Sequence, residues 1–316
     1  MKDQFGRTIN YLRISVTDRC NFRCRYCMPE QGVTKRSHND ILTLEEIAEI
    51  TDAAVSLGIT KIRLTGGEPL VRRGIEELCR KLKSNHNLKE LTLTTNGSLL
   101  AEKAVILKQS GVDRLNISLD TLREERFRSI TRCGSLGNVL QSIDAAEAAG
   151  FEGTKINTVL IGGFNDDEIP DIAGLTRDRA LNVRFIELMP IGEANKWPKS
   201  AFVNAGTVLE RVPELKRIGT DGAAELYQIP GAAGKVGLIR PLSHNFCGEC
   251  SRIRLTADGM LKPCLHSDTE IPLRGLHGEE LLYAIREGIC NKPARHYINR
   301  DGISGTENRT MNEIGG

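Results

Sequence analysis

The chain has 316 residues, of which 40% are hydrophobic and 27% charged, a composition typical of a globular protein with a large core. Its net charge of +2 is too small to favour nucleic acid as a partner, and an aromatic content of 4% argues against a surface that stacks bases. No apolar segment resembles a secretion signal or a membrane span, so we expect a cytoplasmic protein with reduced cysteines and no membrane partner.

Short β-like runs alternate with helical runs between residues 11 and 190. We predict strands at residues 11–16, 60–65, 90–95, 113–119, 154–161 and 182–188. One helix is expected to begin at the capping box of Thr43 and Glu46, and further helices are predicted at 73–84, 99–110, 136–149 and 167–180. This alternation predicts a parallel sheet, either open and doubly wound or part of a barrel, with ligands at the carboxyl ends of the strands.

Three cysteines follow the first predicted strand with the spacing C-x3-C-x2-C, namely Cys20, Cys24 and Cys27. A structural zinc site and a standard iron–sulfur cluster both take four protein ligands, whereas this loop offers three thiolates. Three thiolates can hold a [4Fe–4S] cluster that keeps one iron open to a substrate or cofactor. The alternative is half of a zinc site that is completed elsewhere.

Basic residues occur inside four of the predicted strands, among apolar neighbours. They are Arg13, Arg63, Lys155 and Arg184. A sheet covered by helices holds little water on its faces, and a buried guanidinium without an anionic partner is strongly destabilising. Convergence on one polyanionic ligand such as a triphosphate would satisfy all four, and salt bridges at strand ends are the alternative.

The alternation ends after residue 190. Residues 191–205 are expected to form a loop, and a basic β-like run follows at 235–241. A second cysteine group has the spacing C-x2-C-x13-C and consists of Cys247, Cys250 and Cys264. The intervening residues 252–260 predict a strand and a hairpin turn, which would return the third cysteine to the first two. A second [4Fe–4S] cluster is favoured, and a zinc site completed by His244 or His266 is the alternative.

These motifs together resemble the GTP 3′,8-cyclase family of molybdenum-cofactor biosynthesis, which belongs to the radical S-adenosylmethionine (SAM) superfamily. The resemblance also rests on Thr65-Gly66-Gly67-Glu68-Pro69, on the arginines after the second CxxC and on the terminal Gly315-Gly316, and it runs over nearly the whole chain. It implies an α/β fold: an incomplete six-stranded (β/α) barrel over residues 1–190. A C-terminal region, 191–316, would carry the second cluster, close the barrel and end in the Gly-Gly tail.

The resemblance implies a lyase that converts GTP to 3′,8-cyclo-7,8-dihydro-GTP in the first step of molybdenum cofactor biosynthesis. A 5′-deoxyadenosyl radical derived from SAM would take the 3′ hydrogen of GTP, and C3′ would then add to C8. Two [4Fe–4S] clusters and SAM would be the cofactors. An external electron donor and the downstream cyclic pyranopterin monophosphate synthase would be partners, and a homodimer is one option for the oligomeric state.

The resemblance also assigns ligands to residues. Cys20, Cys24 and Cys27 would bind the first cluster, and Cys247, Cys250 and Cys264 the second. SAM would contact Tyr26, Gly67, Ser118 and Met189. GTP would contact Arg13, Arg63, Thr94, Lys155, Arg252, Ile253 and Arg254, to which the strand argument adds Arg184. Catalytic roles would fall to Arg252, Arg254, Gly315 and Gly316.

Two other functions remain open on the sequence. One is a different radical SAM enzyme with an auxiliary cluster, such as a peptide-modifying maturase, although such enzymes usually carry more C-terminal cysteines and lack a Gly-Gly end. The other is a non-catalytic iron–sulfur or zinc-binding regulator, against which the basic residues inside the strands argue. The predicted glycine turn at Gly66 and Gly67 is likewise either a ligand contact or a simple β–α turn.

Overall fold

The computed structural model describes residues 1–33, 36–244, 246–296 and 309–315. Its strands are β1 (Tyr11–Ser15), β2 (Lys61–Thr65), β3 (Glu90–Thr95), β4 (Arg114–Ser118), β5 (Lys155–Leu160), β6 (Asn182–Glu187), β7 (Lys216–Asp221), β8 (Ala224–Gln228), β9 (Lys235–Ile239), β10 (Arg252–Leu255), β11 (Met260–Lys262) and β12 (Ile271–Pro272). Its α-helices are α1 (Leu44–Ser56), α2 (Ile75–Lys83), α3 (Leu100–Gln109), α4 (Glu124–Thr131), α5 (Leu136–Ala148), α6 (Ile169–Gly174), α7 (Thr207–Arg211), α8 (Gly278–Cys290) and α9 (Met311–Ile314). The 3₁₀ helices are η1 (His38–Asp40), η2 (Pro69–Val71), η3 (Asp166–Glu168), η4 (Gly192–Lys196), η5 (Lys199–Ala201) and η6 (Cys247–Glu249).

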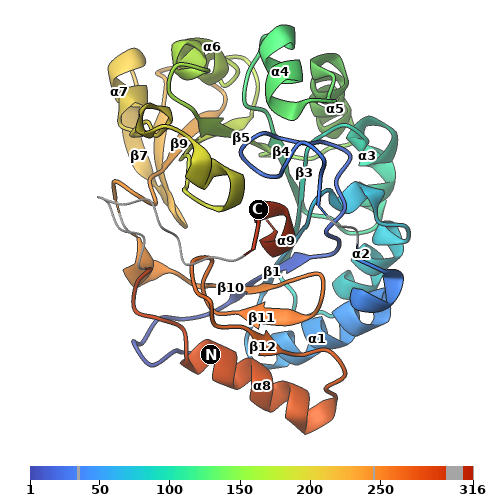
Figure 1. The fold of residues 1–316 in the computed structure, drawn as a ribbon. Helices are drawn as coiled ribbons and strands as arrows, with labels where there is room; N and C mark the ends of the chain where they lie inside the picture. The colour runs from blue at the N-terminus through green and yellow to red at the C-terminus, as the bar shows by residue number, and fades with distance from the viewer. Residues whose placement is uncertain (34–35, 245, 297–308, 316) are drawn as a thin grey trace.

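The strands of the described residues form one sheet in the order β12-β11-β10-β1-β2-β3-β4-β5-β6-β9-β8-β7. The six predicted strands are confirmed as β1 to β6, which lie side by side in chain order and run parallel. Two C-terminal strands extend this parallel block, because β10 pairs with β1 and β9 pairs with β6 in the same direction. Figure 1 shows the sheet curving around α9, with α1 to α6 on the outside.

Two helix predictions need correction. Helix α4 was missed, because its eight residues bury too few apolar side chains to show a helical period, chiefly Phe127 and Ile130. The helix predicted at 167–180 ends at Gly174, after which the backbone forms turns. There the Thr176 hydroxyl donates to the Ala173 carbonyl, a local bond that competes with the helix ladder. The predicted loop 191–205 contains the short helices η4 and η5.

The two faces of the sheet have different chemistry. Successive side chains of a strand point to opposite faces, so β1, β2 and β10 each send one set into the apolar core and one set inward. Leu12, Ile62 and Ile253 stand in register and are fully buried beneath the outer helices. The alternate residues, Arg13, Arg63 and Arg254, stand in register on the inner face, which makes that face strongly cationic.

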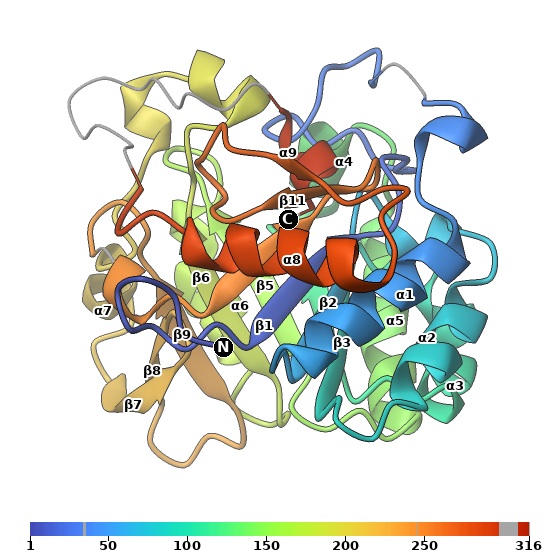
Figure 2. The same cartoon turned by 90° about the horizontal axis from the view of Figure 1, so that it is seen from below.

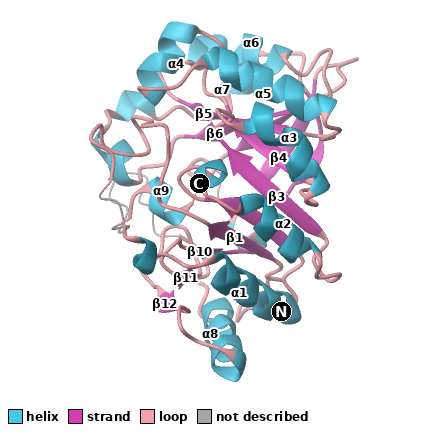
Figure 3. Cartoon of the chain, turned by 90° about the vertical axis from the view of Figure 1, so that its right-hand side faces the viewer, coloured by secondary structure: helices cyan, strands magenta, loops and turns pink. Residues whose placement is uncertain are grey.

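The C-terminal residues add to both sides of the molecule. Helix α8 contacts α1 and β11, and Figure 2 shows it lying across the molecule near the N-terminus. Figure 3 shows α9 on the side to which the arrowheads of the parallel strands point. Among the described residues, no helix is both long and apolar enough to cross a membrane.

Replacement of Thr43 by Ala tests the capping box that begins α1. The Thr43 hydroxyl accepts from the Glu46 amide at 3.1 Å, and the Glu46 carboxylate accepts from the Thr43 amide at 2.7 Å. Loss of the cap is expected to lower the free energy of unfolding by about 1 kcal/mol in urea denaturation. Ser56→Ala at the exposed end of the same helix is the control and should change it by less than about 0.5 kcal/mol. Equal stability of the two variants would contradict the capping role.

Candidate active site

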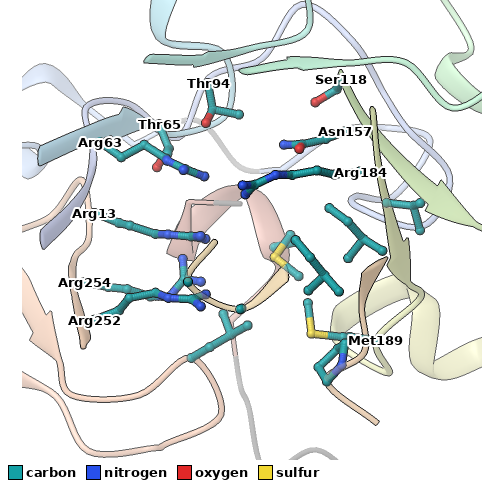
Figure 4. Close-up of a pocket in the computed structure, with 18 of the residues that line it drawn as sticks. Arg13, Arg63, Thr65, Thr94, Ser118, Asn157, Arg184, Met189, Arg252 and Arg254 are labelled. Carbon is teal, nitrogen blue, oxygen red and sulfur yellow. The ribbon is translucent and has the colours of Figure 1, made fainter. Parts of the chain in front are cut away.

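A cavity of about 440 Å³ runs along the inner face of the sheet. Residues from β1 to β6, β9 and β10 line it, together with both cysteine groups and α9. Figure 4 shows arginines from β1, β2, β6 and β10 pointing into this space from opposite sides. Parallel strands end at the same edge, so this is where the fold gathers the residues that follow each strand.

The first cysteine group lies in the loop after β1. Cys20, Cys24 and Cys27 are free thiols that line the cavity. Burial raises the pKa of Cys20 to about 11 and that of Cys27 to about 12, and it raises the pKa of Cys24 well above its ordinary value, with the neighbouring Cys27 adding to the effect. Three mutually interacting thiols on one wall suit a multi-iron centre, whose positive charge would stabilise them as thiolates.

The glycine turn after β2 holds this loop in place. A Cβ on Gly67 would lie 2.3 Å from the Arg19 carbonyl oxygen, and one on Gly66 would lie 2.4 Å from that of Thr17. The Gly67 amide donates to the Thr17 carbonyl and the Glu68 amide to the Arg19 carbonyl, each at 2.8 Å. The immediate reason for glycine is therefore the close approach of the loop backbone that leads into Cys20.

Two buried carboxyl groups near the first cysteine group were missed from the sequence. Glu68 accepts from the Thr95 hydroxyl and the Asn96 amide, both at 2.7 Å, and burial raises its pKa to about 7. Asp120 accepts from the Tyr26 hydroxyl at 2.8 Å, and burial raises its pKa to about 6. The signal in the sequence was the position of each residue shortly after a predicted strand that carries other candidate residues.

The four residues assigned to SAM all line the cavity, namely Tyr26, Gly67, Ser118 and Met189. Tyr26 lies within the first cysteine loop, while Ser118 ends β4 and Met189 follows β6. They therefore reach the cavity from the carboxyl ends of separate strands, as the sequence predicted for ligand-binding residues. Figure 4 shows Ser118 and Met189 on the side of the cavity that carries Arg184.

The second cysteine group lies on another part of the wall. Cys247 begins the short helix η6 and Cys250 follows it, and the β10–β11 hairpin returns the chain to Cys264, as predicted. All three line the cavity. Burial raises the pKa of Cys250, but Lys292 and Arg252 outweigh it, so the pKa lies below its ordinary value. Within the described part of the chain, no three His, Cys, Asp or Glu side chains gather so as to hold a single metal ion.

The arginines of the inner face repel one another. Burial lowers the pKa of Arg63 to about 9, and that of Arg254 lies well below its usual range because of burial and the nearby Arg13. Burial alone would raise the pKa of Tyr11, yet Arg63 and Arg13 reverse the shift. The buried Nε atoms of Arg13, Arg63 and Arg184 have no hydrogen-bond partner among the described residues. Unpaired buried donors of one sign indicate a site built for an anion.

Two of the predicted cations have a carboxylate partner. Asp221, at the end of β7, accepts from Lys155 at 2.7 Å and from Arg184 at 2.5 Å. Burial opposes ionisation of Asp221, but these two cations hold its pKa down at about 2. Lys155 and Arg184 therefore form salt bridges, the alternative that the sequence left open for the basic residues inside the strands. Asp221 was missed because neither β7 nor β8 was predicted.

The remaining assigned positions differ in accessibility. Thr94 lines the cavity, and its buried hydroxyl has no partner among the described residues. Arg252 lies 5.2 Å above the Phe246 ring. Ile253 is fully buried in the apolar core on the opposite face of β10, so it can meet a ligand in the cavity only through its backbone.

The C-terminal segment enters the cavity. Arg309 bonds to Asp258 at 3.0 and 3.1 Å and to Glu270 at 2.6 Å, which anchors the segment to the β10–β11 hairpin and the following loop. Met311 and Asn312 line the cavity. The Gly315 carbonyl accepts from the Arg254 guanidinium. Gly316 lies outside the described residues.

Comparisons with known proteins agree with this arrangement. Residues 14–176 match the radical SAM superfamily, and residues 181–298 match the family described as Molybdenum Cofactor Synthesis C. The chain is 54% identical to the GTP 3′,8-cyclase of Peptoclostridium acidaminophilum over 95% of its own length and 96% of that protein. It is 47% identical to the GTP 3′,8-cyclase of Alkaliphilus oremlandii over the full length of both.

The fold also resembles a solved structure. Streptococcus suis SuiB bound to S-adenosylmethionine superimposes with a TM-score of 0.64 at 15% identity, over 88% of this chain and 68% of that one. At this identity the likeness concerns the fold alone.

Replacement of Gly67 by Ala tests how the cysteine loop is positioned. The added methyl group would meet the Arg19 backbone, so the loop and the turn must separate. We expect a loss of about 2 kcal/mol in unfolding free energy and a loss of up to one [4Fe–4S] cluster per chain in iron analysis after reconstitution. Gly174→Ala, where a Cβ has open space, is the matched control. The positioning role is wrong if both variants load the same amount of iron.

Proposed function

The chain belongs to the GTP 3′,8-cyclase family, and from this premise we propose how its own residues share the work of the reaction. It is a radical SAM enzyme that converts GTP to 3′,8-cyclo-7,8-dihydro-GTP, the first step of molybdenum cofactor biosynthesis. Its superfamily uses a [4Fe–4S] cluster and SAM. The observation that carries the assignment of residues is one cavity with a cysteine loop on one wall and unpaired arginines on another.

The first cysteine group fits the SAM-cleaving cluster. Cys20, Cys24 and Cys27 would hold that cluster, which would supply the electron for the cleavage of SAM into methionine and the 5′-deoxyadenosyl radical. In this proposal the radical would take the 3′ hydrogen of GTP before C3′ bonds to C8. The chain must hold both substrates in one orientation and exclude water from the radical. The enclosing sheet and the inserted C-terminal segment support this role.

SAM is cationic at its sulfonium and ammonium groups, and the wall near the first cysteine group carries carboxyl groups. Glu68 and Asp120 are buried there, and burial raises the pKa of both, so a nearby cation would favour their ionised form. In this proposal Tyr26, which donates to Asp120, contacts the adenosine end. Gly67, Ser118 and Met189 complete the SAM site from the adjacent strands.

GTP is anionic, and the inner faces of the strands carry the cations. We assign its triphosphate to the guanidinium and ammonium groups of Arg13, Arg63, Lys155 and Arg184. Bidentate contacts to phosphate oxygens would satisfy the unpaired Nε atoms and relieve the repulsion among the arginines. The unpaired hydroxyl of Thr94 is a further contact. The two substrates would thus be sorted by charge within one cavity.

We assign the second cysteine group to a second [4Fe–4S] cluster whose open iron holds the guanine base. Arg252 and Arg254 lie on the strand between Cys250 and Cys264, and they would place two guanidinium groups beside the bound nucleotide. The zinc alternative with His244 or His266 is disfavoured, because no three His, Cys, Asp or Glu side chains of the described residues gather so as to hold a single metal ion.

The remaining assignments follow from the family. An incomplete six-stranded barrel over residues 1–190 and a closing region over 191–316 are proposed as the two parts of the enzyme. Strands β9 and β10 from the second part pair with both sides of the first, which supports the closing role. An external electron donor and the cyclic pyranopterin monophosphate synthase are the proposed partners.

The function is tested under anaerobic conditions. The protein is reconstituted with iron and sulfide, reduced, and given SAM and GTP, and 5′-deoxyadenosine and the GTP-derived product are separated by chromatography. Both should form in the wild type, whereas Cys247→Ala should lose the GTP-derived product. Cys290→Ala, a cysteine outside the cavity, is the control and should retain both. Deoxyadenosine without any GTP-derived product in the wild type would overturn the substrate assignment but not the radical chemistry.

Gly315→Ala tests the role of the C-terminal segment. Gly315 has a φ of +79° and a Cβ there would lie 2.3 Å from the Thr65 hydroxyl, so the segment must withdraw from Arg254. We expect the GTP-derived product to fall by about two orders of magnitude while SAM cleavage continues. Deletion of Gly315 and Gly316 should have the same effect.

The control for Gly315 is Gly163→Ala, which also has a positive φ but open space around its Cβ and no place in the cavity wall. This control separates the effect of backbone strain at a positive φ from the effect of displacing the C-terminal segment. Equal product yields from the two alanine variants would rule out a role for Gly315 in cyclisation.

A further inference from the structure

The β7–β8 hairpin brings one carboxylate to the cationic wall. Asp221 ends β7 and lines the cavity together with the turn residues Gly222 and Ala223. A single oxygen, Oδ2, lies 2.7 Å from the Lys155 ammonium and 2.5 Å from the Arg184 guanidinium. Of the basic side chains assigned to GTP, these two are the ones that pair with a carboxylate within the described residues.

The two sides of this ion pair are built differently. Lys155 and Arg184 lie on β5 and β6, which have parallel neighbours on both sides, and their side chains are 4% and 9% exposed. Asp221 lies on the edge strand of the sheet, and its side chain is 48% exposed. The cations are thus held by the core, whereas the carboxylate comes from a surface hairpin that contributes little to it.

Asp221 also has space to turn away. It borders a second cavity of about 530 Å³ at the amino ends of β4, β5 and β6, whose lining includes Glu152 and Thr220. Lys155 and Arg184 border both cavities. A rotation of the Asp221 side chain would leave the two cations facing the main cavity and keep the carboxylate in contact with solvent.

We propose that Asp221 is a counter-ion that occupies a phosphate subsite of the empty enzyme and is displaced when the substrate triphosphate binds. This inference rests on the proposed GTP site. A carboxylate oxygen and a phosphate oxygen would use the same N–H donors of Lys155 and Arg184, and two anions at one subsite repel each other. Asp221 therefore weakens the binding of every ligand whose phosphates reach this subsite and leaves the binding of a ligand without phosphates unaffected.

The test measures nucleotide binding to cluster-loaded protein under anaerobic conditions, without reductant or SAM, by isothermal titration calorimetry at fixed salt. The ligands are GTP, GDP, GMP and guanosine. Asp221→Asn keeps the size of the side chain but removes its charge. It should lower the Kd for GTP by about tenfold and leave the Kd for guanosine unchanged. The Kd values for GDP and GMP should show how many phosphates a nucleotide needs for this gain in affinity.

The matched control is Glu225→Gln on the same hairpin. Glu225 pairs with Arg240, and neither residue lines the main cavity. This variant removes the same charge from the same element, so it should bind GTP as the wild type does. Thermal unfolding of both variants checks that the hairpin remains folded.

The outcomes separate this inference from the function. Wild-type protein that binds GTP, with Asp221→Asn binding it equally or more weakly, overturns the counter-ion role alone. An equal gain for guanosine also overturns it, because the effect would then not involve phosphate. Wild-type protein that does not bind GTP overturns the proposed GTP site and this inference together.

Discussion

Positive charge held on the inner face of the sheet is the constraint on which the site depends. Arg13, Arg63 and Arg254 stand side by side because parallel strands in register place them there. Such an arrangement is unfavourable by itself, and the pKa of Arg63 is lowered first by burial and then by the neighbouring Arg13, Arg184 and Arg252. The apolar outer face, buried under the helices, contributes the stability that offsets it. The repulsion among these guanidinium groups, and the affinity that they would have for a polyanion, therefore both come from the positive charge gathered on the inner face.

Strand β2 links the three parts of the site. It carries Arg63 to the cationic wall and Thr65 to the C-terminal segment, and it leads directly into the glycine turn that docks the first cysteine loop. Two of these contacts depend on the close approach of a glycine, Gly315 to the Thr65 hydroxyl and Gly67 to the Arg19 backbone. A small shift of this strand would therefore disturb the cysteine loop, the position of Arg63 and the C-terminal segment together.

The cavity also separates charge along its length. Glu68 and Asp120 follow the carboxyl ends of β2 and β4 near the first cysteine group, whereas Arg13, Arg63 and Arg254 lie within the strands on the inner face. A cationic and an anionic substrate can then occupy one cavity without exchanging places, because each would meet like charge in the other's position. Asp221 pairs with two of the cations, Lys155 and Arg184, from a hairpin outside the parallel block.

The sequence by itself determined the local features. The six strands, the capped start of α1 and the cysteine spacings were all readable, because each depends on residues close together in the chain. Short helices without a full apolar period, such as α4, were not readable, and the edge hairpin β7–β8 with its mostly exposed residues was not either. Only the tertiary structure decided which side chains meet. The pairing of Asp221 with Lys155 spans 66 residues, and that of Arg254 with Gly315 spans 61, and contacts at that separation are set by strand order and packing rather than by any local pattern.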